Sequence, residues 1–305
     1  MTHTPPRPVV CIGAVHYDTL AHASQGILRE TSTPAVFSTK PGGVATNVAR
    51  TLVKLGLETR LIGALGNDNA AKILTNVLNA EGIQFASTSR TGFSTGQYIA
   101  FHDPDGSLAA ACVDDRVLSE APADLLDRQL DDASQATDAI WFVDANLPVD
   151  LLRTVAEHAP KGRLIVNAVS NAKALRLKPV ITKISCMMLN RGEAVALTGS
   201  SAISSTQNLI KSLRNMGANQ IVLTDGSADI LVHDGQTTLS YKPDTVKIVD
   251  VTGAGDALTA GTIAGLARGF DLHKAIQTGL KAASLTLRTT GALADGLSWD
   301  TLRKS

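Results

Sequence analysis

The sequence has no excess of charge, because 28 Lys and Arg residues balance 28 Asp and Glu residues over 305 positions. A polynucleotide-binding protein needs a basic surface to neutralise phosphates, so no polynucleotide partner is expected. Cysteine is also scarce. Cys11, Cys112 and Cys186 are far apart, and each lies in an apolar stretch, which excludes a disulfide framework and a zinc site and predicts three small core residues.

Long hydrophobic runs are missing as well, since no segment approaches the ~20 apolar residues that span a bilayer. No membrane partner is therefore expected. Residues 1–8 lack the apolar segment of a secretory signal, and the cytoplasm is the expected location. The 44% apolar and 18% charged content is ordinary for a globular protein. This length suits a single domain, residues 1–305, with an accessory lobe.

Short apolar runs alternate with segments of helical spacing along the chain. The β-prone runs are residues 9–12, 139–143, 164–166, 186–189 and 220–224, and the helical segments include 44–55, 70–80, 151–157 and 207–216. This alternation predicts an α/β fold with a mostly parallel central sheet flanked by helices. Ligands of such sheets bind outside the carboxyl ends of the strands.

Two stretches interrupt the alternation, residues 15–40 and 94–116. In the second, Asp103-Pro104-Asp105-Gly106 separates two β-prone runs and predicts a hairpin. Neither a long linker nor an internal repeat is present, so both stretches are expected to form a small β-sheet lid lobe inserted into the one domain. Because small sheets have exposed edges, the lobe is also expected to join a homodimer.

The most informative motif runs from Gly253 through Ala254 and Gly255 to Asp256, at the start of a predicted helix. Glycines at a helix N-terminus leave backbone N–H groups free to hold a phosphate or an oxyanion. Asp256, beside that anion hole, can accept the proton of a hydroxyl group that attacks a γ-phosphoryl group. Taken alone, the motif also fits an ordinary strand-to-helix turn.

A second glycine-rich helix start makes the ordinary turn less plausible. It consists of Pro41, Gly42 and Gly43, followed by Asn47. With both elements in this order, the sequence closely resembles the ribokinase-like (PfkB) carbohydrate and nucleoside kinases over nearly its whole length. The resemblance implies a ribokinase-like fold, ATP as phosphoryl donor and a small sugar or nucleoside as acceptor.

The resemblance also implies roles for individual residues. Gly42, Gly43 and Asn47 would hold the substrate hydroxyls, and Asp18 would accept hydrogen bonds from a pair of them. The nucleotide loop is represented by Thr224 and Gly226, with Asp229 in place of the usual final glycine. Asn190 and Glu193 stand where relatives organise Mg²⁺ through water. Asp250, Thr252 and Gly291 stand where many relatives bind K⁺. Whether this chain binds K⁺ stays open.

Within the family, several segments look most like bacterial pseudouridine kinases, which phosphorylate the 5′-hydroxyl of a C-nucleoside. These segments are residues 103–116, 143–146, 167–173 and 250–260. Candidate substrate contacts in or near them are His16, Asp114, Asp144, Asn146 and Asn167. Asn167 and Ala168 depart from the Asp-Pro pair common in those relatives.

Other functions remain open. A ribokinase-like or fructokinase-like enzyme of the same family would share every motif above. A non-catalytic ligand-binding regulator is disfavoured by the intact Asp256, Asn190 and Glu193. A dinucleotide-binding oxidoreductase is weaker still, because Gly63-Ala64-Leu65-Gly66 lacks the complete glycine fingerprint.

Overall fold

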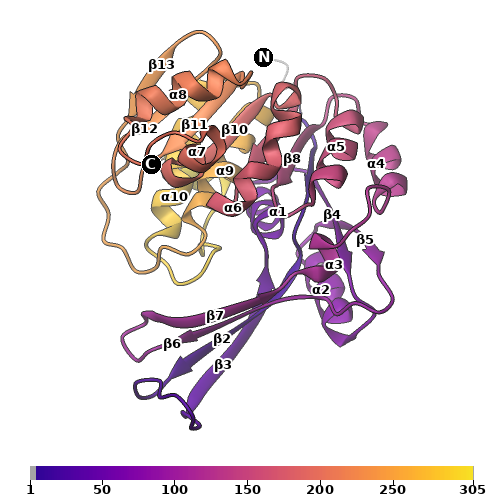
Figure 1. Cartoon of the computed structure of the whole chain (residues 1–305), viewed down its shortest axis with the longest axis vertical. Coiled ribbons are helices and arrows are strands. Elements are labelled where there is room, and N and C mark those ends of the chain that lie inside the picture. Colours follow the sequence, from indigo (N-terminus) through magenta and orange to yellow (C-terminus); the bar gives the residue numbers. More distant parts are fainter. Residues whose placement is uncertain (1–4, 305) are drawn as a thin grey trace.

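A computed structural model describes residues 5–304, which form two β-sheets (Figure 1). The large sheet has nine strands in the order β13-β12-β11-β10-β9-β8-β1-β4-β5, and the small sheet has four in the order β3-β2-β6-β7. The strands are β1 (Val9–Ile12), β2 (His16–Ala23), β3 (Ala35–Gly42), β4 (Thr59–Leu65), β5 (Gln84–Ser89), β6 (Gly96–His102), β7 (Leu108–Asp114), β8 (Ile140–Asp144), β9 (Leu164–Asn167), β10 (Cys186–Asn190), β11 (Gln220–Thr224), β12 (Ile230–His233) and β13 (Thr238–Tyr241).

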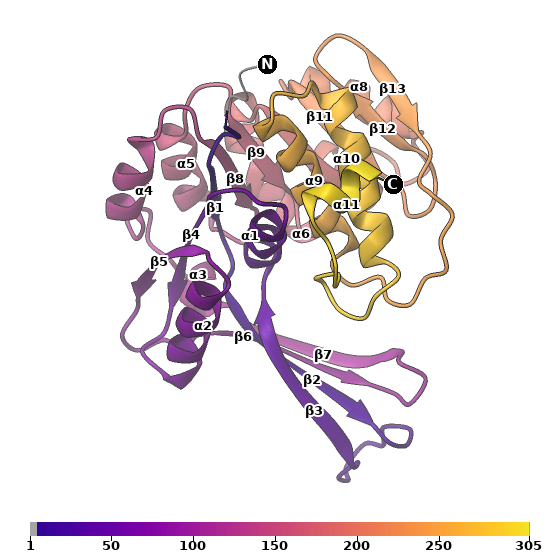
Figure 2. The same ribbon diagram turned by 180° about the vertical axis from the view of Figure 1, so that it is seen from behind.

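The large sheet is parallel from β5 to β11, and only β12 and β13 run antiparallel at one edge. The helices are α1 (Val44–Lys54), α2 (Asn69–Ala80), α3 (Arg116–Ser119), α4 (Asp127–Ser134), α5 (Val149–His158), α6 (Asn171–Ala174), η1 (Leu175–Lys183), α7 (Arg191–Thr198), α8 (Thr206–Asn215), α9 (Ala254–Ala267), α10 (Leu272–Thr286) and α11 (Trp299–Lys304). Helices α3 to α8 with η1 cover one face, and α1, α2, α9, α10 and α11 cover the other, seen from behind in Figure 2. The predicted mostly parallel sheet between helices is confirmed.

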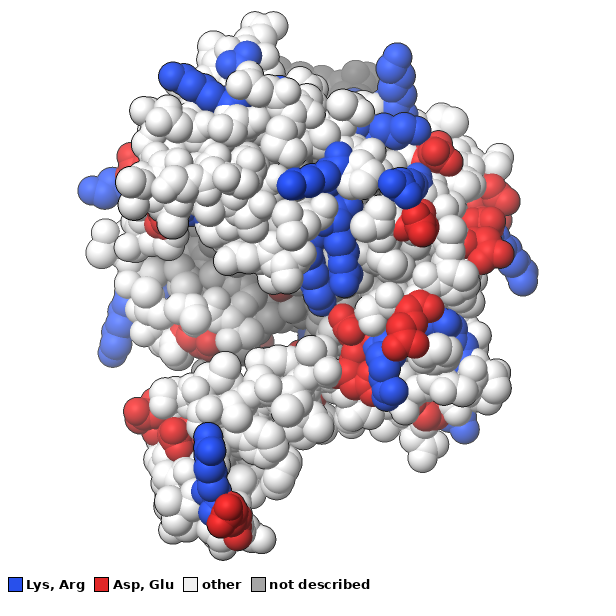
Figure 3. All heavy atoms as spheres, in the orientation of Figure 1, with Lys and Arg blue, Asp and Glu red and all other residues white. Residues whose placement is uncertain are grey.

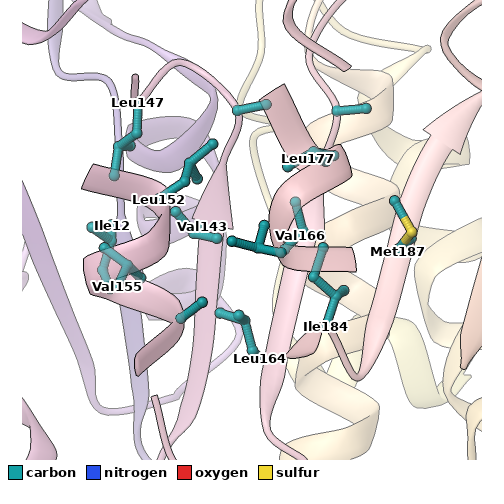
Figure 4. Close-up of a cluster of buried hydrophobic side chains, with 14 of the residues drawn as sticks. Ile12, Val143, Leu147, Leu152, Val155, Leu164, Val166, Leu177, Ile184 and Met187 are labelled. Carbon is teal, nitrogen blue, oxygen red and sulfur yellow. The ribbon is translucent and has the colours of Figure 1, made fainter. Parts of the chain in front are cut away.

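Alternation of side chains along the central strands divides the core into two layers. On β8, Trp141 and Val143 pack on the first helical face, whereas Ile140 and Phe142 pack on the second. Figure 4 shows part of the first layer, where Val143 lies beside Leu152 and Val155 of α5, and Leu177 of η1 belongs to the same cluster. A strand buried on both faces needs apolar residues at every position, which explains the uninterrupted apolar runs in the sequence.

The small sheet forms a lobe that projects from the main body (Figure 1). Its outer strands pair antiparallel with their neighbours, and β2 and β6 pair parallel between them. The predicted hairpin around the turn at 103–106 is present as β6 and β7. The core position predicted for Cys112 is wrong: β7 is an edge strand with no layer packed on it, and this thiol is exposed, while Cys11 and Cys186 are buried.

Charged side chains of both signs are spread over the face in Figure 3, and several of them lie on the lobe toward its free end. The same view shows a hollow between the lobe and the main body. Within residues 5–304, none of the helices has the length and apolar character that a bilayer crossing requires.

Candidate active site

Four neighbouring strands end in polar residues at one edge of the large sheet. Asp144 lies beside Asn167 in the pairing of β8 with β9, and Asn190 lies beside Thr224 in the pairing of β10 with β11. Because parallel strands point the same way, their carboxyl ends converge, and polar groups there can contact a ligand. The polar residues that could bind a ligand are therefore gathered at this edge of the sheet.

Helix α9 starts over this edge with the predicted glycine motif. Gly253 is the N-cap and has a left-handed φ of 75°, and a side chain there would overlap Ala292. The first intrahelical bond runs from Ala257 N–H to Gly253 O, at 2.8 Å. The N–H groups of Gly255 and Asp256 precede that bond and have no backbone partner within residues 5–304. They are free to contact an anion, so the anion hole expected from the sequence stays a prediction that this geometry allows.

Asp256 lies in the first turn of α9, and its carboxylate accepts a hydrogen bond from Asn47 Nδ2 at 2.9 Å. Burial, together with the charge of Asp144, raises the pKa of Asp256 to about 7, although the Asn47 hydrogen bond opposes the shift. A carboxyl group with a pKa near neutrality both accepts and releases a proton readily, as a general base must. Asn47 thereby connects the first glycine motif to the second.

A second carboxylate, that of Asp18 on β2, lies close to the backbone just before α1. Gly43 caps α1 with φ 96°, and a methyl group on Gly42 would overlap the carboxylate of Asp18. Only glycine leaves room for that carboxylate at this end of β3.

Asp18 carries an unsatisfied acceptor. Its Oδ1 is buried and has no hydrogen-bond partner within the described part of the chain. Burial raises the pKa of Asp18 to about 6, against the charge of Lys40. Such an orphaned oxygen is costly unless a ligand donates to it, which supports the predicted contact with substrate hydroxyls.

A pocket of about 210 Å³ lies at the start of α9, and the predicted sugar-binding residues Asp18, Gly42, Gly43 and Asn47 are not in its lining. It is lined by predicted site residues from the ends of β9, β10 and β11 and the starts of α7 and α9: Asn167, Asn190, Glu193, Thr224, Gly255 and Asp256. Val169 also lines it and has φ 66°, an unusual conformation for a β-branched residue. Asn167 Oδ1 holds this turn by accepting the Val169 N–H at 2.8 Å. Strained backbone of this kind is typical of ligand sites.

Asp144 does not contact this pocket, contrary to the prediction from its strand-end position. It is fully buried, and its carboxylate accepts backbone N–H groups from Ala14, Ala45 and Asn146 at 3.1, 2.9 and 3.0 Å. Burial raises the pKa of Asp144, and these three bonds oppose the shift. Asp144 therefore fixes the start of α1 and the end of β1, and it acts on the site through them.

A polar cluster lies where the lobe joins the main body. Lys173 Nζ donates to Asn146 Oδ1 at 2.6 Å and to Asp115 Oδ2 at 3.1 Å. Asn146 is only 3% exposed. His16 belongs to the same surroundings: burial lowers its pKa to about 4, the charge of Asp115 opposes this, and the charge of Lys173 adds to it. His16 Nε2 is buried without a partner in residues 5–304.

The expected pocket role of Asp114 is not met. This residue ends β7 on the surface, where its carboxylate pairs with Arg116 at 2.7 Å. The hydrogen bonds from Arg116 lower the pKa of Asp114 to about 2. Its neighbour Asp115, which was not predicted, points to Lys173 instead. Asp115 lies in the subfamily-like segment 103–116 and Lys173 in the segment 167–173, so a sequence signal covered both residues of this pair.

The nucleotide side of the site has two parts. Thr224 lines the pocket, and Gly226 takes the left-handed φ of 59° in the turn that follows β11. Asn190 and Glu193 form a capping box at α7, with N–H to side-chain distances of 2.9 and 2.8 Å. Asp229, in place of the family glycine, accepts from Ser240 on β13.

The predicted magnesium residues fit a water-mediated ion better than direct ligation. Within residues 5–304, no group of three or more His, Cys, Asp or Glu side chains is arranged to hold a metal. Glu193 is fixed at the pocket wall by the capping box, and burial raises its pKa. One carboxylate with retained waters and substrate phosphates is the usual environment of Mg²⁺.

The residues predicted for K⁺ are brought together by hydrogen bonds. Asp250 Oδ1 accepts the Thr252 N–H and Oδ2 accepts the Gly291 N–H, each at 2.8 Å. Burial alone would raise the pKa of Asp250, but these bonds and the charge of Lys40 lower it overall. These bonds tie the segment that precedes α9 to the loop at Gly291.

Comparisons with known proteins agree with this geometry. Residues 7–299 match the pfkB family of carbohydrate kinases. The pseudouridine kinase of Escherichia coli (strain K12) is 25% identical over 285 residues, which cover 92% of this chain and 90% of that protein. The cytidine kinase of Thermococcus kodakarensis is 26% identical over 267 residues, covering 83% and 90%.

A solved structure shows the same fold. The Arabidopsis thaliana ribokinase complexed with ribose and ATP superposes with a TM-score of 0.83 at 21% identity, covering 99% of this chain and 100% of that one. The ribokinase-like fold expected from the two motifs is confirmed. The chain therefore belongs to the pfkB family of carbohydrate kinases and is an ATP-dependent phosphotransferase that acts on a sugar or nucleoside.

Proposed function

We propose that this kinase transfers the γ-phosphoryl group of ATP to the 5′-hydroxyl of pseudouridine, giving pseudouridine 5′-phosphate and ADP. The observation that carries the phosphoryl-transfer chemistry is Asp256, a partly buried carboxylate with a pKa of about 7 beside two free N–H groups of α9. The substrate assignment is supported by the similarity to the Escherichia coli pseudouridine kinase along nearly the whole chain.

In the proposed reaction, Asp256 accepts the proton of the 5′-hydroxyl. At the same time, the oxygen of that hydroxyl forms a bond to the γ-phosphorus of ATP. The bond from that phosphorus to the bridging oxygen of ATP breaks, and ADP leaves with the electron pair. The N–H groups of Gly255 and Asp256 face the charge that develops on the phosphoryl oxygens. Asn47 holds the carboxylate of Asp256 in place at 2.9 Å.

Mg²⁺ would be held through water at Asn190 and Glu193 and would neutralise charge on the ATP phosphates. Thr224 and Gly226 are proposed to contact those phosphates from the turn after β11. The sugar hydroxyls would bind near Asp18, Gly42, Gly43 and Asn47, where the orphaned Asp18 oxygen lies.

Replacing Asp18 by Ala is expected to weaken substrate binding, because the sugar hydroxyls lose a buried charged acceptor. The loss should be about 1–3 kcal/mol, or roughly 5–150-fold in KM, with a smaller change in kcat. Calorimetric titration of the nucleoside measures this directly. Asp105→Ala, in the exposed turn of the same lobe, is the matched control. Unchanged affinity of Asp18→Ala would place Asp18 outside the substrate site.

A second candidate is another nucleoside or sugar kinase of the same family, which the similarity to the Thermococcus kodakarensis cytidine kinase favours. An ATP-consumption screen with Mg²⁺ across pseudouridine, uridine, cytidine, ribose, fructose and adenosine decides between the two. Pseudouridine should give the highest kcat/KM. If no substrate is consumed although ATP binds, a non-catalytic regulator becomes the better assignment.

We also propose that the lobe is a lid and joins two copies of the chain. Cross-strand register puts Val113 and Val36 on the lobe face that carries Asp18, and these side chains are 56% and 74% exposed. Every residue of Leu108–Val113 is exposed on this edge strand. Such an apolar face and open edge are suited to pairing with a second lobe.

The expected result is a dimer in sedimentation experiments at micromolar concentration. The double variant Val36→Asp and Val113→Asp should shift the protein to monomer, since it places charges in the apolar contact. Ile203→Asp is the control, because Ile203 is 90% exposed on the main body. A wild-type monomer across this range would contradict the proposed dimer.

A further inference from the structure

Lys40 stands out as a cation that the reaction described above does not use. It lies near the end of β3, directly opposite Asp18 on β2, and belongs to the lobe. Its side chain is half-buried and reaches toward the main body, where a methyl group on Gly291 would lie 3.4 Å from Lys40 Nζ. Apart from Gly291 itself and its two chain neighbours, no other atom of residues 5–304 would lie within 4 Å of that methyl group.

The place that Lys40 reaches is the loop behind the anion hole. There Asp250 accepts the N–H groups of Thr252 and Gly291. Thr252 precedes Gly253, the N-cap of α9, and Gly253 packs directly on Ala292. The carboxylate of Asp250 is thus connected through two short segments to the start of the helix that faces the phosphoryl group.

A carboxylate in this position has an electrostatic cost. Its negative charge opposes the binding of an anion at the nearby N-terminus of α9 unless a cation neutralises it. Lys40 supplies such a charge, since its Nζ lies beside Gly291, whose N–H is bonded to Asp250.

A resident potassium ion does not fit beside this lysine. An ammonium group next to Gly291 would repel a second cation at this loop, whereas the oxygens of Asp250, which accept one backbone N–H each, keep lone pairs that a cation could use once the ammonium is removed. Lysine ammonium, K⁺ and NH₄⁺ each carry one positive charge, so any one of them can neutralise the Asp250 carboxylate. Two of them at this loop would repel each other.

We propose that the ammonium group of Lys40 is the built-in monovalent cation of the phosphoryl-transfer loop and replaces an exchangeable one. Because Lys40 belongs to the lobe, two residues before Gly42, its ammonium group brings this charge from the lobe end of β3 to the loop at Asp250 and Gly291. The wild-type enzyme should therefore work without K⁺, and removing the ammonium group should create a site for K⁺ or NH₄⁺.

The test compares wild type, Lys40→Met and Lys40→Arg while KCl or NH₄Cl replaces tetramethylammonium chloride at constant ionic strength. Lys72→Met, an exposed lysine of α2, is the control. We expect kcat of wild type and of the control to change less than about twofold with K⁺. The kcat of Lys40→Met should be about tenfold or more below that of wild type in tetramethylammonium chloride, which is within the range found for removing one stabilising group. In K⁺ or NH₄⁺, this variant should recover much of the lost kcat. Lys40→Arg should stay independent of K⁺.

Thermal unfolding without substrate gives a second readout. K⁺ should raise the Tm of Lys40→Met but not that of wild type, since a cation that binds only the folded state stabilises it. The kinetic comparison rests on the proposed kinase reaction with whichever acceptor the screen selects. The unfolding comparison does not, so failure of the pseudouridine assignment leaves it intact.

Two results would overturn the proposal. One is activation of the wild-type enzyme by K⁺ of tenfold or more. The other is a folded Lys40→Met variant in which neither K⁺ nor NH₄⁺ raises kcat or Tm.

Discussion

Asp256→Asn should lower kcat by roughly 10²–10⁴ while leaving the fold and the affinity for the acceptor nearly unchanged. The carboxamide keeps the shape of the side chain and its place beside Asn47, but it cannot take the proton of the attacking hydroxyl. The anion hole is made of backbone N–H groups and survives the change. Steady-state kinetics with ATP and Mg²⁺ measures the loss, and Asp132→Asn, on the exposed surface, is the control.

The pH dependence gives an independent check of the same role. Burial raises the pKa of Asp256 to about 7, so the carboxyl is protonated below this pH and cannot act as a base. In the wild-type enzyme, kcat/KM should fall about tenfold for each pH unit below about 7. Asp256→Asn should lose this limb of the profile. A kcat within threefold of wild type would remove Asp256 from the mechanism.

Local sequence patterns were sufficient for those parts of the site that a short segment determines. Gly253 and Gly43 have positive φ angles, and the glycine-rich motif at the start of each helix predicted both positions. The five apolar runs became β1, β8, β9, β10 and β11 because strands buried on both faces need continuous apolar sequence. Strands with weaker patterns were missed, namely β4, β5, β12 and β13.

Contacts between distant segments were beyond the reach of such patterns. Asp144 was expected to touch substrate, but its three backbone partners include Ala14 and Ala45, which only the folded sheet brings to it. The cluster of Lys173, Asn146 and Asp115 likewise joins the lobe, a strand end and α6. Lys40 reaches Gly291 across the same junction. Each depends on pairing register and on the position of the lobe, which composition and spacing leave undetermined.

If the substrate is the proposed nucleoside, we expect the choice between bases to depend on the polar groups at this junction. Pseudouridine differs from uridine by a carbon–carbon glycosidic bond and one additional ring N–H, so a selective site needs an acceptor for that N–H. His16 offers one: burial lowers its pKa to about 4, which keeps the ring neutral at pH 7, and Nε2 has no partner within residues 5–304. Asn146 Oδ1 already accepts from Lys173, and Asp114 points to the surface.

We therefore expect kcat/KM for pseudouridine to exceed the values for uridine and ribose by at least about 10²-fold. A buried acceptor left unpaired costs about 1–3 kcal/mol, and sites built around a substrate hydrogen bond discriminate strongly. His16→Phe fills a similar volume without an acceptor and should reduce the preference over uridine by about tenfold or more, mainly through loss of pseudouridine turnover. His22→Phe, farther along β2, is the matched control. Comparable turnover of ribose or fructose by the wild-type enzyme would reject pseudouridine as the substrate, while the kinase chemistry at Asp256 would stand.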